Sequence, residues 1–335
     1  MRNAALILVL LTTSPSFGSP LFEENSILDV TISGPLSTLL KHKQDGEEYP
    51  FSLTVDDASI DVAVRVRGNS RVVVCRFPPL RLNFTKAGPD GTAFAGEDKL
   101  KLVTHCRNGD DKSQSSVLNE FTAYRIFNLI SDQSYRVRLL KIRYEDTDGK
   151  QKKLEEPHYG FLIESDEGLE RRLGGTVAKV EALRFSSLDI LQTARINVFQ
   201  YLIGNKDWSF VTADSANACC HNIDLLDVDS SLVPIPYDFD LAALTQAKYR
   251  GDGQLNQSRR REYFGYCRTP ADMLDQAIDY IQPLKDEILT TVLEVPALDD
   301  KSRERRAKFI SSYFEEALGK TSLLAKFDRD CIGKR

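Results

Sequence analysis

Three short motifs in the second half of the chain carry the side chains that phosphoryl transfer requires. In order, they supply Asp207, Asn222 and the pair Asp238 and Asp240, which flank a phenylalanine. Transfer from ATP needs one carboxylate to orient the attacking hydroxyl, and oxygen ligands for the divalent ions that neutralise the phosphates. The motifs therefore predict a site in which Asp207 is catalytic and Asn222, Asp238 and Asp240 bind metal.

Other roles for the same residues compete with this interpretation. Asp207 could cap a helix end, and Asp238 and Asp240 could form a turn, since a proline precedes them. Two carboxylates beside an apolar side chain are costly to bury without a cation, which favours metal binding. A metal-dependent phosphoesterase that uses His221 with the three aspartates is another alternative, although the chain lacks the clustered histidines usual in such sites.

The elements that must position these residues fall into two halves. Residues 27–165 are predicted to be mainly strands, because apolar and polar residues alternate at 62–67 and 80–84 between turn-forming residues. Further strands are expected at 100–103, 137–144 and 159–164. Apolar residues at helical spacing predict one helix over 116–130.

The helical period dominates after Gly174 and Gly175. Apolar stripes predict helices near 191–202, 273–281 and 309–318, the first leading directly into the Asp207 motif. The predicted fold class is α+β, a two-lobed arrangement like that of protein kinases. Residues 25–170 would form a strand-rich N-lobe with one helix, and residues 176–335 a mainly helical C-lobe.

The first residues are typical of a secretory signal peptide, assigned to residues 1–19. A basic Arg2 precedes a short apolar run, followed by small residues. No later segment is long and apolar enough to predict a membrane span. The net charge of −5 argues against a general nucleic-acid or anionic-membrane binder. We therefore expect an exported protein, periplasmic or extracellular, with no nucleic-acid partner.

The six cysteines agree with export, because an even number in an exported chain favours disulfides. Cys75 with Cys106 is the expected local pair, and Cys219 or Cys220 with Cys267 the next. Neighbouring cysteines rarely bond to each other. A zinc site at Cys219, Cys220 and His221 is the competing interpretation, disfavoured because contiguous residues cannot all face one tetrahedral ion.

Several motifs together resemble the spore-coat CotH family of atypical secreted kinases. The likeness spans roughly residues 60–245 and includes Arg-Gly-Asn-Ser-Arg at 67–71, Pro-Leu-Arg-Leu-Asn-Phe at 79–84 and Lys-Leu-Lys-Leu at 99–102. It continues with Asn-Glu-Phe-Thr-Ala-Tyr at 119–124 and Tyr-Gly-Phe-Leu-Ile-Glu at 159–164, and closes with the Asp207, Asn222 and Asp-Phe-Asp motifs.

The resemblance implies a diverged kinase fold that binds ATP with Mg or Mn and phosphorylates Ser or Thr on an exported protein. It implies that Asp207 orients the substrate hydroxyl and that Asn222, Asp238 and Asp240 hold the metal. On the nucleotide side, it implies a phosphate-covering loop from Arg67 to Arg71, in which Gly68 permits close backbone approach, and a phosphate-facing Arg81. Glu120 would orient a basic group, and Glu164 would lie near the adenine edge. The oligomeric state is not specified.

Two features depart from the family pattern. Asp207 and Asn222 are separated by an insertion that contains Cys219 and Cys220, and Phe77-Pro78 replaces a basic pair before the Arg81 strand. A disulfide that pins the insertion, so that Asn222 still reaches the metal, is one hypothesis. The same departures also fit a pseudokinase, an exported binding or structural protein that no longer catalyses.

Overall fold

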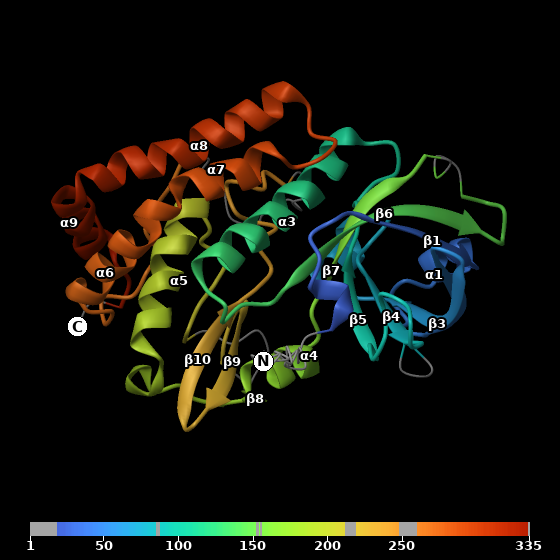
Figure 1. Ribbon diagram of the computed structural model, residues 1–335, viewed down its shortest axis with the longest axis horizontal. Coiled ribbons are helices and arrows are strands. Elements are labelled where there is room, and N and C mark those ends of the chain that lie inside the picture. Colours follow the sequence, from blue (N-terminus) through green and yellow to red (C-terminus); the bar gives the residue numbers. More distant parts are fainter. Residues whose placement is uncertain are drawn as a thin grey trace, which may run out of the picture.

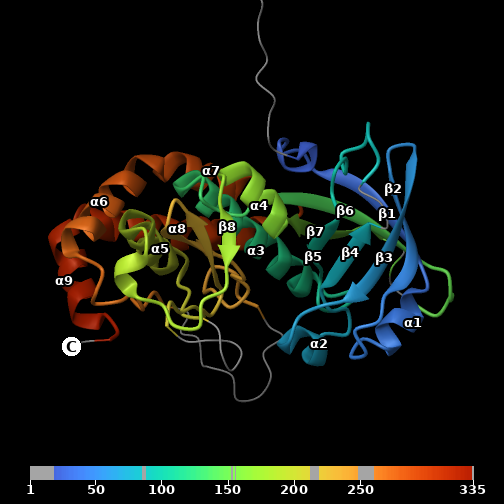
Figure 2. The same ribbon diagram turned by 90° about the horizontal axis from the view of Figure 1, so that it is seen from below.

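The computed structural model describes residues 19–84, 88–151, 154, 156–211, 219–247 and 260–333. The predicted signal peptide therefore lies outside the described residues, except for Ser19. The described chain is mixed α+β, as predicted. In Figure 1 a strand-rich part lies to the right and a helix-rich part to the left, with helix α3 between them; Figure 2 shows the same two parts side by side after a quarter turn.

Seven strands form a closed barrel in the order β1-β2-β3-β4-β5-β7-β6. Only the β1–β6 contact that closes the barrel is parallel. Side chains on alternate positions fill its interior, because successive residues of a strand point to opposite faces. The strands are β1 (Leu28–Gly34), β2 (Tyr49–Val55), β3 (Ala58–Val66), β4 (Leu80–Phe84), β5 (Lys99–Val103), β6 (Val137–Asp146) and β7 (His158–Ile163).

Helix α3 (Asp111–Ile130) begins at the cap residue Asp110, whose side chain accepts from the Lys112 N–H. It packs on β6 and β7 on one side and on α5 and α7 on the other. Its buried residues belong to the same apolar cluster as the helix-rich part, so α3 links the two parts of the molecule.

The helix-rich part contains a second, three-stranded sheet in the order β10-β9-β8. Its strands are β8 (Thr176–Ala178), β9 (Ile223–Val228) and β10 (Ser231–Pro236). The helices are α4 (Asp166–Leu173), α5 (Ile190–Ile203), α6 (Ala271–Ile281), α7 (Lys285–Leu293), α8 (Asp300–Leu318) and α9 (Lys320–Asp330), with 3₁₀ turns at Pro20–Phe22, Phe185–Ser187 and Gln282–Leu284. No described helix has both the length and the apolar content needed to cross a bilayer.

The expectation of a single helix among the first strands was wrong. The short helices α1 (Leu36–Lys41) and α2 (Ser70–Val74) also occur there, and α4 follows β7 directly. Helices α1 and α2 span fewer than two turns, so they offer too few residues for a periodic pattern to appear in the sequence. Helix α2 carries Arg71, whose guanidinium contacts carboxylates from other parts of the chain.

The cysteines pair as Cys75–Cys106, Cys219–Cys220 and Cys267–Cys331. The first pair confirms the prediction. The prediction that Cys219 or Cys220 bonds to Cys267 was wrong, because the fold brings the C-terminal end of the chain beside Cys267. The Cys267 N–H donates to the Ile332 carbonyl at 3.0 Å, next to Cys331. The zinc alternative fails too, since both neighbouring sulfurs are committed to a disulfide.

Candidate phosphoryl-transfer site

The β9–β10 hairpin brings Asn222 and Asp238 together. Asn222 immediately precedes β9, and Asp238 follows β10 by two residues. Because Ile223 pairs with Pro236, Asn222 and Asp238 lie at the same end of the hairpin. The Tyr237 N–H donates to the Asn222 carbonyl at 3.1 Å and extends this pairing. Asn222 and Asp238 have φ of 53° and 55°, a left-handed conformation that Asn and Asp tolerate better than most residues.

Asp207 is held by the turn that ends helix α5. Gly204 adopts the left-handed conformation that closes many helices and donates to the Gln200 and Tyr201 carbonyls. The Asn205 side chain then accepts from the Asp207 N–H at 3.0 Å, and Trp208 is buried beneath the turn. The local sequence therefore fixes the direction in which Asp207 leaves the helix.

The Asp207 carboxylate accepts hydrogen bonds from the hairpin. Its Oδ1 lies 2.9 Å from His221 Nε2, and Asn222 Nδ2 donates to its Oδ2 at 3.1 Å. The same Nδ2 donates to the Asp207 carbonyl at 2.7 Å. The described residues thus bring Asp207 and Asn222 into contact despite the insertion between them. Because both contacts with Asp207 use the amide nitrogen of Asn222, its amide oxygen lies on the side of the amide group that faces away from Asp207.

Arg71 joins the remaining carboxylates of the site. Its Nε donates to Asp240 Oδ2 at 2.8 Å, and one terminal nitrogen donates to Glu120 Oε2 at 2.8 Å and to Asp238 Oδ1 at 3.2 Å. Glu120 comes from α3, while Asp238 and Asp240 follow β10. The Glu120 and Asp240 side chains are almost completely buried, whereas that of Asp238 is 45% exposed.

The site holds more carboxylates than its guanidinium groups balance. Burial raises the pKa of Glu120 to about 8; Arg71 opposes this shift, and Asp238 and Asp240 add to it. Partial burial also raises the pKa of Asp238, to about 6, with the Asp240 charge acting in the same direction. Arg67 interacts with the Asp238 charge, and burial lowers the pKa of Arg67. A further cation would relieve the crowding of negative charge.

The donor set fits a hard divalent cation in type and charge. Asp238 offers a half-exposed carboxylate, Asp240 a second carboxylate and Asn222 an amide oxygen, which are ligands that Mg and Mn accept. The described residues include no group of three or more His, Cys, Asp or Glu side chains arranged to hold a metal. Arg71 engages Asp238 and Asp240, so a metal would have to share these carboxylates with Arg71 or displace it.

The predicted phosphate-binding residues lie on and beside the barrel. Gly68 has φ of 100° in the connection between β3 and α2, a conformation that favours glycine. Arg81 is half-buried on β4, and the strand register places it directly between Arg65 on β3 and Lys101 on β5. Residues paired in this way share one face of a sheet, so three basic side chains form a row across the strands.

Lys101 is a residue of the site that the sequence reasoning did not assign. Its Nζ lies 3.1 Å from Asp166 Oδ1, 5.4 Å from the centre of the Tyr135 ring and 6.0 Å from that of Tyr237. Tyr237 immediately precedes Asp238, which places Lys101 near the metal-binding candidates. The signal was present in the Lys-Leu-Lys-Leu motif, whose alternation sets both lysines on one face of the strand. The resemblance placed Arg71 in the loop over the phosphates; the structure places it on α2, where it pairs with carboxylates that are distant in sequence.

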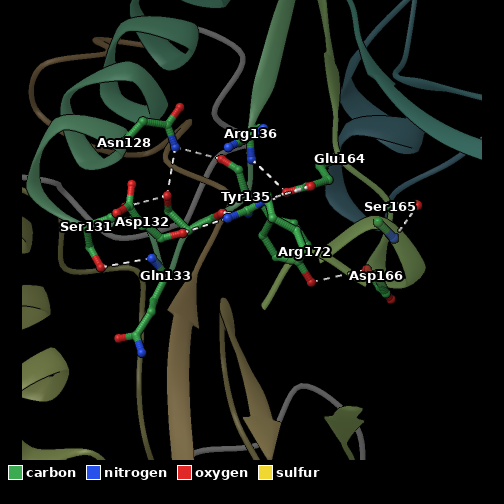
Figure 3. A network of polar contacts seen from close by, with 12 residues as sticks. Asn128, Ser131, Asp132, Gln133, Tyr135, Arg136, Glu164, Ser165, Asp166 and Arg172 are labelled. Atoms are coloured by element: carbon green, nitrogen blue, oxygen red, sulfur yellow. Dashed lines mark hydrogen bonds and ion pairs between the residues drawn. The ribbon is translucent and has the colours of Figure 1, made fainter. Parts of the chain in front are cut away.

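Glu164 lies at the end of β7 and pairs with Arg172 (Figure 3). Arg172 Nε donates to Oε1 at 3.0 Å and a terminal nitrogen donates to Oε2 at 2.7 Å, while the Arg136 N–H donates to Oε2 at 3.1 Å. The prediction that Glu164 marks the adenine edge stays a prediction. Its carboxylate is already fully engaged by protein groups.

Comparison with known proteins adds a weak structural likeness. The chain matches no protein-family model and no curated protein. One structural neighbour is the Shewanella oneidensis toxin–antitoxin complex of HipA, HipB and operator DNA, with 14% identity, a TM-score of 0.31, and coverage of 75% of this chain and 66% of that one. The chain thus spans just under two thirds of that neighbour. A TM-score this low does not establish a shared fold.

Proposed function

We propose that this chain is an exported atypical kinase that transfers the γ-phosphoryl group of ATP to a Ser or Thr hydroxyl of an exported protein. Residues 25–170 would be the N-lobe and residues 176–335 the C-lobe of a kinase-like fold, similar to the CotH family. The observation that supports this most is the convergence of Asp207, Asn222 and Asp238, tied through Arg71 to Glu120 on α3.

In this proposal, Asp207 accepts the proton of the substrate hydroxyl and orients the oxygen for attack. His221 and Asn222 hold the Asp207 carboxylate in place by the hydrogen bonds described above. Asn222, Asp238 and Asp240 would hold Mg or Mn, and the metal would supply positive charge to the phosphates. Glu120 positions Arg71, so that its guanidinium stays beside Asp238 and Asp240.

The phosphates would lie against the row of basic residues on the barrel. Arg67 and Gly68 would cover them from the connection before α2, and Gly68 permits a close backbone approach. Arg81 and Lys101 would supply positive charge from β4 and β5. Lys101 would have to exchange Asp166 for a phosphate oxygen, a change that its flexible side chain allows.

A non-catalytic pseudokinase is the second candidate, and one observation favours it. Arg71 contacts both Asp238 and Asp240, the carboxylates assigned to the metal. An arginine that stays there would supply the positive charge in place of a metal ion. A pseudokinase of this kind would bind nucleotide without a metal requirement, or not at all. Among the described residues, the observation that favours the phosphoesterase alternative is the contact between His221 and Asp207.

The first test is ATP binding by the oxidised mature protein, measured by calorimetry with and without Mn. We expect Mn-dependent binding that Asp238→Asn removes. Asp229→Asn is the matched control, because Asp229 is exposed at the tip of the β9–β10 hairpin. Its φ of 51° is also close to the 55° of Asp238. Binding that ignores Mn would support the pseudokinase, and no binding by the folded protein would reject the kinase proposal.

A further inference from the structure

A polar cavity lies between the C-terminal end of α3, the connection from α3 to β6, and α4. Its volume is about 150 Å³, and its lining includes Arg125, Asn128, Asp132, Arg136 and Arg172. Figure 3 shows Asn128, Asp132, Arg136 and Arg172 around this connection. Three guanidinium groups in one small cavity are unusual, because each needs anionic or carbonyl partners when it leaves water.

Arg172 has its partners within the protein. Besides Glu164, it donates to the Asp132 carbonyl at 2.8 Å and the Ser134 carbonyl at 2.6 Å. Its charge is balanced by Glu164, so it forms a fixed wall of the cavity. The amide nitrogen of Asn128 is similarly committed, because Nδ2 donates to Ser134 Oγ and to the Tyr135 carbonyl, each at 2.9 Å, whereas its buried Oδ1 has no hydrogen-bond partner among the described residues.

The Arg125 and Arg136 side chains differ from Arg172. Within the described residues neither guanidinium has a hydrogen bond or ion pair. Burial lowers the pKa of Arg125, and no neighbouring carboxylate acts on it in the opposite direction. Arg138, near the start of β6 and two residues after Arg136, shows the contrast: its guanidinium donates to the Leu21 and Glu24 carbonyls, the Glu24 carboxylate and Ser26 Oγ.

The charge that remains in the cavity is positive. Arg125 and Arg136 contribute two positive charges, and the exposed carboxylate of Asp132 contributes one negative charge, while Arg172 and Glu164 cancel. Guanidinium groups suit phosphate-like oxyanions because their planar donors match two oxygens at once. The volume is well below the roughly 300–1,000 Å³ of sites for drug-sized ligands, so a nucleotide would not fit.

We propose that this cavity binds a small phosphate-class oxyanion between Arg125 and Arg136, with Arg172 as its fixed wall. The site is separate from the Asp238 site, and it does not depend on the proposed kinase activity. Because Arg172 also ties the α3–β6 connection to Glu164, a bound anion would stabilise this connection, and the thermal midpoint would keep rising with the logarithm of the anion concentration above its dissociation constant.

The test is calorimetric titration of the full mature chain with inorganic phosphate, without ATP or metal, at constant ionic strength set by chloride. Arg125→Gln and Arg136→Gln are expected to weaken phosphate binding by about tenfold or more each, as expected for loss of a charge-assisted hydrogen bond. Arg171→Gln is the matched control, because Arg171 is exposed on α4 next to Arg172. Its affinity should equal that of the wild-type protein.

Two results would overturn the proposal. One is the absence of phosphate binding by the wild-type protein. The other is binding that Arg71→Gln abolishes but Arg125→Gln and Arg136→Gln leave intact, which would place the anion in the Asp238 site. Thermal unfolding of each variant checks that it folds. Should Arg125→Gln fail to fold, Arg125→Lys keeps the charge, removes the planar fork and is expected to weaken binding as well.

Discussion

Two buried arginines, Arg71 and Arg172, have nearly the same exposure but opposite surroundings. Each side chain is 10% exposed, and each pairs with a glutamate that is almost fully buried, Glu120 at 3% and Glu164 at 5%. Arg172 has one carboxylate and two carbonyl partners, so charge is balanced around it. Arg71 has three carboxylates; burial, with the neighbouring negative charges adding to it, raises the pKa of both Glu120 and Asp238.

The difference separates a structural ion pair from a candidate site. A balanced buried pair needs nothing further from solvent, and breaking it leaves an isolated charge in the interior. A cluster with surplus carboxylates is less favourable by itself and gains from a proton or a metal ion. Both glutamates were predicted to be functional from the sequence, and for both this stays a prediction; they differ in that Glu120 lies among surplus carboxylates and Glu164 in a balanced pair.

The largest expected effect is on stability, and it should differ between the two arginines. Arg172→Ala leaves Glu164 buried without its cation and should lower the free energy of unfolding by about 3–5 kcal/mol. Arg71→Ala should cost less, about 1–3 kcal/mol, because protonation can neutralise the remaining carboxylates. Denaturant unfolding measures both. Saturating Mn should restore Arg71→Ala and leave Arg172→Ala unchanged; equal rescue of both would contradict the comparison.

A second test separates the metal ligands from the rest of the cluster. Asp238→Asn should reduce phosphoryl transfer by about a hundredfold or more, since it removes charge where the phosphates need a counter-ion. Its stability should not fall, because the change relieves repulsion from Asp240. Turnover of labelled ATP and thermal unfolding measure the two properties. Loss of fold together with loss of activity would mean that Asp238 is structural.

The pH dependence of stability should arise from the Arg71 cluster. Burial raises the pKa of Glu120 from 4.5 to about 8, so the folded protein retains a proton that the unfolded chain releases. Its contribution to stability is therefore full below the unfolded pKa and decreases as the pH rises toward 8, by at most about 1.4 kcal/mol per pH unit. Glu120→Gln should flatten this slope in denaturant unfolding across that pH range. An unchanged slope would show that Glu120 is ionised in the folded protein.

The smallest expected effect concerns the Cys219–Cys220 disulfide, which directly precedes His221 and Asn222. Replacing both cysteines by serine should weaken Mn binding by about tenfold, the lower end for groups that support a metal ligand. The double substitution leaves the other two disulfides intact, which chemical reduction would not. Unchanged Mn affinity would show that the hairpin alone positions Asn222.

Much of the fold could be predicted from local patterns. Alternation identified β3 and β4, and helical spacing identified most of α3, α5, α6 and α8. These elements are long or regular enough that their buried residues form a periodic apolar pattern in the sequence. Helix α2 could not be found this way, and neither could the closed barrel, because the parallel contact of β1 with β6 joins residues about a hundred positions apart.

The sequence by itself determined which chemical groups the site contains and the order in which they occur. It named Asp207, Asn222, Asp238, Asp240 and Glu120, because their side-chain types and local motifs limit what they can do. Only the tertiary structure decided which groups meet. Arg71 reaches Asp240 across 169 residues, and Lys101 reaches Asp166 across 65 residues. Such pairings depend on how the elements pack, and packing leaves no local pattern in the chain.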